Sequence, residues 1–280
     1  MKLEHLPQAP ARPHDFFALD SMEVAVKLPE REAPIQIHCK IAGNGPPRLL
    51  IHGLMTSGYS FRYIIPALAE QFQVIVPDLP GAGRSEAPAD LSMSPRSVAQ
   101  FISCLISALH IEPPYVVGNS LGGYQALWFA VLFPDQVRKL VVMHAPGFPQ
   151  LRLSAMRFIT ARRAGRQLAR WLICRDPEGF AARNIHYHDP SIMSREEARE
   201  YGAIFRDRDR TVVFVQPEMW DTIDGETLMI LLAEIAETLP EVMRLVQEGQ
   251  EVVVVDYEIW KQKMRQYQAR EGVDNDSGNN

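Results

Sequence analysis

The sequence predicts an α/β protein built on a mostly parallel sheet with helices on both faces. Short apolar runs of strand length alternate with longer segments of helical periodicity. The runs are apolar at nearly every position, which indicates strands that are buried on both faces. A length of 280 residues and a hydrophobic content of 46% allow one large domain with an inserted subdomain.

The beginning of the chain predicts an arm followed by an antiparallel strand pair. The arm, residues 1–20, contains several prolines and is expected to be loosely packed. Residues 22–27 and 35–41 alternate between apolar and polar side chains, as neighbouring half-buried strands do. A buried strand over residues 48–52 comes next.

Helices and strands then alternate up to residue 147, so the α/β core is expected over residues 21–147. Ser94 and Pro95 mark one helix start, because serine caps a first turn and proline fits the first helical position. The remaining elements of the core are helices over residues 59–71, 95–109 and 124–133 and strands over residues 73–76, 115–117 and 139–143.

Residues 148–216 lose the strand pattern and become helical, with eight arginines and only two acidic residues between Arg152 and Arg183. This charge could attract an acidic substrate. The interpretation that we favour is a solvated helix face whose opposite side is packed. In that arrangement five apolar side chains point inward: Leu153, Met156, Leu168, Trp171 and Leu172.

The end of the chain predicts a helix-strand-helix segment over residues 217–270 and a disordered tail over residues 271–280. The strand is the β-prone run at residues 251–255. Two roles stay open for this run, because it can complete the sheet or offer its edge to a partner chain.

A serine stands at the turn between a predicted strand and a predicted helix, in the pattern G-x-S-x-G. Gly118 and Gly122 flank Ser120, and a Cβ at either glycine would clash where the helix passes the strand. The N–H of Leu121 would lie beside Ser120 at the helix N-terminus, where it can stabilise negative charge. The alternative is a serine in an ordinary β-α turn.

Three motifs in this order resemble the α/β-hydrolase superfamily: Gly118 to Gly123, His52-Gly53-Leu54 after a strand, and Asp78 to Ser85 after the next strand. The resemblance covers residues 23–216 and implies the α/β-hydrolase fold with a helical cap inserted at residues 148–216.

For the site, the resemblance implies Ser120 as nucleophile and the main-chain amides of Leu54 and Leu121 as the oxyanion hole. It gives His52 a structural role. A serine at position 120 also excludes the branches of the superfamily that use an aspartate nucleophile, such as haloalkane dehalogenases and epoxide hydrolases.

The serine needs a base, and the family order implies an acid after the seventh strand and a histidine after the eighth. Asp256 directly follows the β-prone run and is the candidate acid, although a helix cap explains it equally well. No histidine follows His188. His144, at the tip of the strand after the nucleophile strand, is the candidate base, and lining of the pocket floor is its alternative role.

No metal or other cofactor is expected. His186, His188 and Asp189 have a spacing that invites a metal-site interpretation, but no further ligand cluster accompanies them. Cap packing or substrate contact explains them better.

These observations predict a serine hydrolase that acts on a small apolar ester or a related acyl or carbonyl compound. The expected pocket lining is Leu54, Met55, Tyr59, Phe148 and Trp171. The alternative is a non-catalytic or truncated member of the fold, a small-molecule binder or a remnant, because the C-terminal histidine is missing.

Composition bounds the expected partners and location. A net charge of −5 and a pI near 5.9 give no signal for nucleic acid or for an anionic membrane, and no stretch has the length of a membrane span. Three widely spaced cysteines favour a reducing compartment, so a cytoplasmic location is expected. The oligomeric state stays open.

Overall fold

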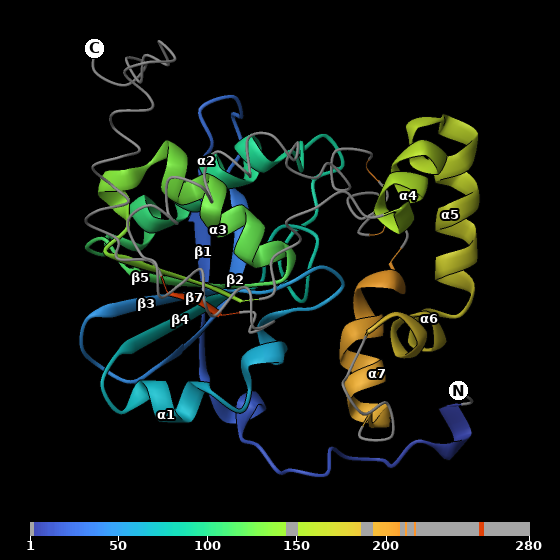
Figure 1. The fold of residues 1–280 in the computed structure, drawn as a ribbon, viewed down its shortest axis with the longest axis horizontal. Helices are drawn as coiled ribbons and strands as arrows, with labels where there is room; N and C mark the ends of the chain where they lie inside the picture. Colours follow the sequence, from blue (N-terminus) through green and yellow to red (C-terminus); the bar gives the residue numbers. More distant parts are fainter. Residues whose placement is uncertain are drawn as a thin grey trace.

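The computed structural model describes residues 3–143, 151–185, 193–207, 211, 216 and 252–254. Within these ranges, seven strands form one sheet in the order β1-β2-β4-β3-β5-β6-β7 (Figure 1). Their bounds are β1 Asp20–Val26, β2 Ile35–Ala42, β3 Pro47–Ile51, β4 Gln73–Pro77, β5 Tyr115–Asn119, β6 Lys139–Met143 and β7 Val252–Val254. The four strands β4, β3, β5 and β6 are parallel and β1 and β2 are antiparallel, so the predicted mostly parallel sheet is confirmed.

Helices α2 and α3 cover one face of the sheet and α1 lies on the other face (Figure 1). The helices of the core are α1 Ile65–Ala69, α2 Pro95–Leu109 and α3 Leu121–Leu132. The predicted cap of α2 is confirmed, because the Ser94 side chain accepts the N–H of Ser97. None of the described helices has the length and hydropathy needed to cross a bilayer.

The helix expected over residues 59–71 is instead two short pieces. A 3-10 turn covers Gly58–Phe61, and α1 starts only at Ile65, with Pro66 in its first turn. Proline has no N–H, and its ring clashes with the carbonyl of the residue four positions earlier. A continuous helix through Pro66 is therefore disfavoured, and the proline begins a new one.

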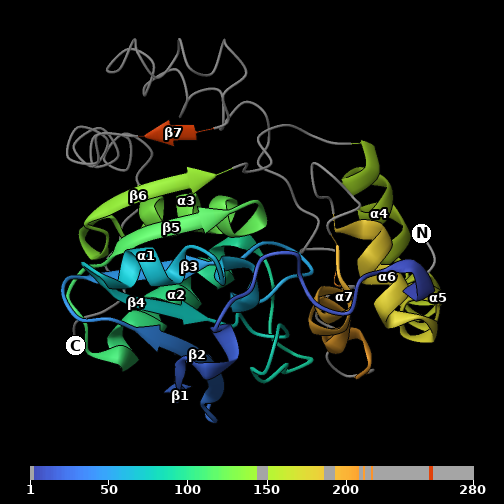
Figure 2. The same cartoon turned by 90° about the horizontal axis from the view of Figure 1, so that it is seen from below.

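The β-prone run near the end of the chain joins the sheet, but in the opposite direction to its neighbour. β7 pairs antiparallel with β6, and Val252 lies opposite Met143 whereas Val254 lies opposite Val141. The carboxyl end of β7 therefore points to the amino end of β6 (Figure 2). In the family pattern implied by the sequence, the acid follows a strand that ends at the same edge as the nucleophile strand.

The helical segment comprises α4 Leu151–Ala161, α5 Arg163–Arg175, α6 Pro177–Asn184, α7 Arg195–Gly202 and the 3-10 turn Ala203–Phe205. Both views place it beyond the carboxyl ends of the parallel strands (Figures 1 and 2). The helical character predicted for this part of the chain is confirmed in the described ranges.

The inward packing expected for α5 is wrong. Leu168, Trp171 and Leu172 are more than half exposed, whereas Ile173 is buried and Ala169 packs against the core. Successive residues of a helix point 100° apart because each turn holds 3.6 residues. The buried stripe is thus displaced by one position from the predicted one. The side chains of Leu153 and Met156 lie outside the described part of the structure.

The N-terminal arm is packed, contrary to the expectation of a loose arm. Leu6 and Phe16 are buried. The carbonyls of Pro7 and Gln8 accept the first two N–H groups of α7, those of Arg195 at 2.8 Å and Glu196 at 3.2 Å. The first N–H groups of a helix have no partner within the helix. An irregular, proline-rich segment can satisfy them because its carbonyls are not used in a helix or a sheet.

A cluster of mostly buried polar side chains joins the arm, the core and the helical segment. Arg62 forms an ion pair with Glu197, and both side chains are at most 4% exposed. Glu196 accepts hydrogen bonds from Tyr59 Oη at 2.6 Å and from His14 Nε2 at 2.8 Å. Burial, together with the bond to Glu196, raises the pKa of Tyr59, so its hydroxyl stays protonated and donates.

We expect Arg62→Met to lower the free energy of unfolding by about 4 kcal/mol, because Glu197 would stay buried without its cation. Urea denaturation measures this loss. The control is Arg183→Met, which breaks the Arg183–Asp176 pair, whose side chains are 51% and 49% exposed. That change should cost less than about 1 kcal/mol. Equal losses for the two variants would contradict the importance of the buried pair.

Candidate active site

Ser120 stands in a strained backbone conformation at the turn between β5 and α3. Its φ of 54° and ψ of −125° are unusual for any residue with a side chain. The Ser120 N–H donates to the Met143 carbonyl at 2.8 Å, and the Ser120 carbonyl accepts the N–H groups of Gly123 and Tyr124. These bonds hold the serine at the tip of the turn, and its side chain is only partly buried.

The two glycines of the motif are required by close contacts of the main chain. A Cβ on Gly118 would lie 2.4 Å from the Gly122 carbonyl oxygen, and a Cβ on Gly122 would lie 2.3 Å from the Ile51 carbonyl oxygen. Both distances are far below van der Waals contact. The predicted reason for the glycines, a close passage of strand and helix, is confirmed.

The loop after β3 lies directly against Ser120. A Cβ on Gly53 would stand 3.1 Å from Ser120 Cβ and 3.7 Å from Ser120 Oγ. The peptide that joins Gly53 to Leu54 is therefore next to the serine hydroxyl. This is the neighbourhood where an oxyanion would form if Ser120 attacked a carbonyl.

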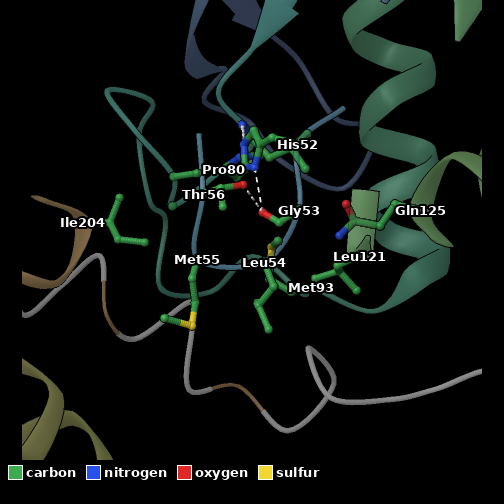
Figure 3. A pocket seen from close by; sticks show the side chains of 13 residues that line it. His52, Gly53, Leu54, Met55, Thr56, Pro80, Met93, Leu121, Gln125 and Ile204 are labelled. Atoms are coloured by element: carbon green, nitrogen blue, oxygen red, sulfur yellow. Dashed lines mark hydrogen bonds between the residues drawn. The ribbon is translucent and has the colours of Figure 1, made fainter. Parts of the chain in front are cut away.

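Hydrogen bonds set the direction of the Gly53–Leu54 peptide. The Gly53 carbonyl accepts from His52 Nδ1 and from Thr56 Oγ1, both at 2.9 Å (Figure 3). In a planar trans peptide the N–H points opposite to the carbonyl, so these two donors direct the Leu54 N–H to the other side. Among the described residues, no acceptor binds the N–H of Leu54 or of Leu121.

His52 is a neutral structural histidine. Its Nε2 accepts the Leu79 N–H at 3.0 Å while its Nδ1 donates to the Gly53 carbonyl. Burial lowers the pKa of His52, with a smaller opposing effect of the nearby Asp78 charge. Both ring nitrogens are occupied, so His52 has no lone pair left to take a proton from Ser120.

The Asp78 turn has a structural function as well. The Asp78 carboxylate accepts the N–H groups of Gly58 at 2.8 Å and Arg84 at 2.9 Å, and its main-chain carbonyl accepts the Ser85 hydroxyl at 2.6 Å. A Cβ on Gly83 would lie 2.0 Å from Asp78 Oδ2. The carboxylate thus closes the turn around itself.

No histidine that the structure describes is placed as a base for Ser120. Besides His52 these are His5, His14, His38 and His110, and none of them hydrogen-bonds to Ser120. Met143, whose carbonyl holds the Ser120 N–H, is directly followed by His144 in the sequence. The predicted site residues His144 and Asp256 lie outside the described residues, as do His186, His188 and Asp189. Within the described ranges no three histidine, cysteine or acidic side chains gather as metal ligands.

A pocket opens beside the Gly53–Leu54 peptide and the start of α3 (Figure 3). It contains about 410 Å³ of empty space, its open mouth included. The side chains that line it are mostly apolar: Leu54, Met55, Leu79, Pro80, Met93, Leu121 and Ile204, with the polar residues His52, Thr56 and Gln125. Ile204 comes from the helical segment, so that segment contributes to the wall.

The predicted lining is right for Leu54 and Met55 and wrong for two other residues. Tyr59 is fully buried in the polar cluster, and Trp171 is 53% exposed on α5, away from this pocket. Phe148 lies outside the described residues. Sequence reasoning missed Thr56 and Gln125. Two signals in the sequence pointed to them. Thr56 follows His52 by only four residues, as expected within one loop, and Gln125 is a polar residue within an otherwise apolar helix.

The fold and the strained serine turn together define an α/β-hydrolase. A family model described as the alpha/beta hydrolase fold matches residues 46–196, more than half of the chain. The protein belongs to this family.

Three relatives show the range of similarity. The chain is 33% identical over 178 residues to a soluble epoxide hydrolase of Corynebacterium sp. (strain C12), covering 59% of the chain and 62% of that protein. It is 37% identical over 118 residues to a 2-hydroxymuconate semialdehyde hydrolase of Pseudomonas sp. (strain CF600), covering 41% and 42%. The solved structure of epoxide hydrolase CorEH without ligand aligns with a TM-score of 0.61 at 27% identity, over 76% of the chain and 78% of that structure. The match spans less than two thirds of the length of these two curated relatives.

We expect the neutral His52 to make stability depend on pH. Below its ordinary pKa of 6.5 the unfolded chain binds a proton that the folded His52 does not, so stability falls as pH falls. The slope from this residue approaches about 1.4 kcal/mol per pH unit. Denaturation midpoints between pH 7.5 and pH 5 should be less pH-dependent in His52→Gln than in the unsubstituted protein. The control His110→Asn changes an exposed histidine, and an equal flattening there would contradict the assignment.

Proposed function

We propose that the protein is a serine hydrolase that cleaves a small ester or a related acyl compound through Ser120. The observation that carries this proposal is the backbone strain at Ser120 together with the contact between Ser120 and Gly53. A strained residue persists only where its surroundings hold it. Such a turn lifts a nucleophile out of the packed core, which an ordinary serine in a β-α turn does not require.

In the proposed reaction, Ser120 Oγ gives its proton to a base and bonds to the carbonyl carbon of the substrate. The negative charge that forms on the carbonyl oxygen is held by the N–H groups of Leu54 and Leu121. The carbonyl re-forms, the alcohol leaves with the proton, and water then releases the acid from Ser120 by the same steps.

His144 is the base that we propose. Support for it comes from connectivity, since Met143 accepts the Ser120 N–H and His144 is the next residue. Asp256 stays the candidate for the acid that orients the base. The direction of β7 argues against this role, because β7 ends near the amino end of β6 and not near its carboxyl end. Val254, at the carboxyl end of β7, lies beside Val141, three residues before His144.

For the substrate, the mostly apolar lining favours a small, largely apolar compound. We propose that the helical segment acts as a cap that sets substrate selectivity. Its Ile204 lines the pocket together with residues of the core. Relatives named as epoxide hydrolases share the fold with this chain. The serine at position 120 favours acyl chemistry over that of branches with an aspartate nucleophile. A cytoplasmic location stays a prediction from the three cysteines, which are all free.

A fluorophosphonate probe tests the nucleophile. We expect covalent labelling of the full chain at one serine and complete loss of labelling in Ser120→Ala, because the probe reacts only with an activated hydroxyl. Ser107→Ala, which removes an exposed hydroxyl on α2, is the control and should label normally. Labelling that persists in Ser120→Ala would refute the assignment.

The same probe tests the base. His144→Gln is expected to slow labelling and ester hydrolysis by about a thousandfold or more, because a lone serine and oxyanion hole retain only residual activity. The change should not affect the circular dichroism spectrum. A His144→Gln variant with an unchanged labelling rate would show that another group takes the proton.

The second candidate function is a non-catalytic small-molecule binder. It is favoured by the antiparallel direction of β7 and by the absence of any histidine after His188 in the sequence. A folded protein that fails to label at Ser120 and yet is stabilised against heat by a small apolar ligand would support the binder over the hydrolase.

A further inference from the structure

Gln125 brings an unsatisfied polar group to the pocket. The residue lies on α3, is only 3% exposed and lines the pocket. In the part of the chain that the structure describes, no donor reaches its buried Oε1. Figure 3 shows the carboxamide pointing away from its helix and toward the other lining residues.

An unpaired acceptor of this kind is costly. Buried side-chain oxygens are nearly always hydrogen-bonded in folded proteins, so an exception calls for an explanation. The other polar side chains of the pocket cannot supply a donor, because His52 Nδ1 and the Thr56 hydroxyl hydrogen both bind the Gly53 carbonyl. Among the described residues, Gln125 Oε1 is thus left open to a donor on a molecule that enters the pocket.

The position of Gln125 relates it to the proposed oxyanion site. It follows Leu121 by four residues, about 6 Å along the helix axis and on the same face. Side chains of a helix lean toward its N-terminus, so the carboxamide reaches back over the turn of Leu121. A ligand whose carbonyl oxygen sits at the Leu121 N–H would have its second or third carbon near this carboxamide.

We propose that Gln125 selects acyl substrates with a hydroxyl group on the second or third carbon, by accepting that hydroxyl through Oε1. This inference rests on the proposed function of the same site and names its substrate class. A hydroxyl both donates and accepts, so it can also bind the amide nitrogen of Gln125. The remaining lining is mostly apolar and suits a short hydrocarbon chain, since the two other polar side chains, His52 and Thr56, already bind the Gly53 carbonyl.

The test compares kcat/KM for the 4-nitrophenyl esters of butanoic, 2-hydroxybutanoic and 3-hydroxybutanoic acid. The unsubstituted protein is expected to prefer one hydroxy ester over the butanoate about tenfold, the effect of one neutral hydrogen bond. Gln125→Met should abolish this preference, so that the ratio of kcat/KM between the hydroxy ester and the butanoate falls to about one. Gln125→Glu keeps an acceptor oxygen and should keep the preference.

Gln136→Met is the matched control. Gln136 also has a buried Oε1 without a partner among the described residues, but it lies outside the pocket. Its substitution should leave the ester preference unchanged. An unsubstituted protein that hydrolyses all three esters equally, or a Gln125→Met variant that keeps the preference, would overturn the inference while the hydrolase function stands.

A binding measurement separates the failure of this inference from failure of the proposed function. Ser120→Ala cannot be acylated, so calorimetric titration with 3-hydroxybutanamide, 2-hydroxybutanamide and butanamide reports recognition alone. Tighter binding of a hydroxy amide that disappears when Gln125→Met is added supports the inference, even if the unsubstituted protein does not label with the fluorophosphonate. Equal affinity for all three amides indicates that only water occupies the Gln125 site, and it overturns the inference.

Discussion

The structure around the pocket depends on one backbone constraint, the close passage of β3, β5 and α3 at Ser120. Three glycines make it possible. Gly118 lets α3 approach β5, Gly122 lets α3 approach the end of β3, and Gly53 lets the next loop touch the serine side chain. A Cβ on Gly118 or Gly122 would lie 2.4 Å or 2.3 Å from a main-chain oxygen, so the backbone would have to move. A Cβ on Gly53, 3.1 Å from Ser120 Cβ, would require a shift of only a few tenths of an ångström. The strain at Ser120 is held by this packing and by the Met143 carbonyl.

The second constraint is the direction of a single peptide, the one between Gly53 and Leu54. His52 and Thr56 hold its carbonyl from one side, and this leaves the Leu54 N–H directed to the other. His52 is in turn fixed by the Leu79 N–H from the loop after β4. Two loops at the carboxyl edge of the sheet thus support each other through a neutral imidazole, whose burial keeps it uncharged.

The helical segment is attached to the core by polar contacts as well as apolar ones. The Arg62–Glu197 pair and the bonds of Glu196 to Tyr59 and His14 lie at the junction of α7, the core and the N-terminal arm. Buried charges restrict how two parts can meet, because each must find its partner. This fixes the position of Ile204, which follows α7 by two residues and forms part of the pocket wall.

Much of the core could be predicted from the sequence because its signals are local. Apolar strand runs, the Ser94 cap and the glycines around Ser120 each reflect contacts between residues close in the chain or geometry of a single turn. The break of the helix at Pro66 was also readable in principle, since the clash of a proline ring is local. The rotation of α5 by one residue could not be predicted from the sequence. Either of two neighbouring rows of apolar residues on this helix could face the core, and only packing selects Ala169 over Leu168.

By itself the sequence determined the fold family, the place of the candidate nucleophile and the two candidate oxyanion amides, since these follow from a short motif with strict steric demands. The tertiary structure alone decided the rest: the tautomer of His52, the direction of β7, the packing of the arm on α7 and the burial of a Gln125 oxygen with no partner among the described residues. Each of these depends on which distant groups become neighbours. No spacing within one segment encodes the partner that another segment brings.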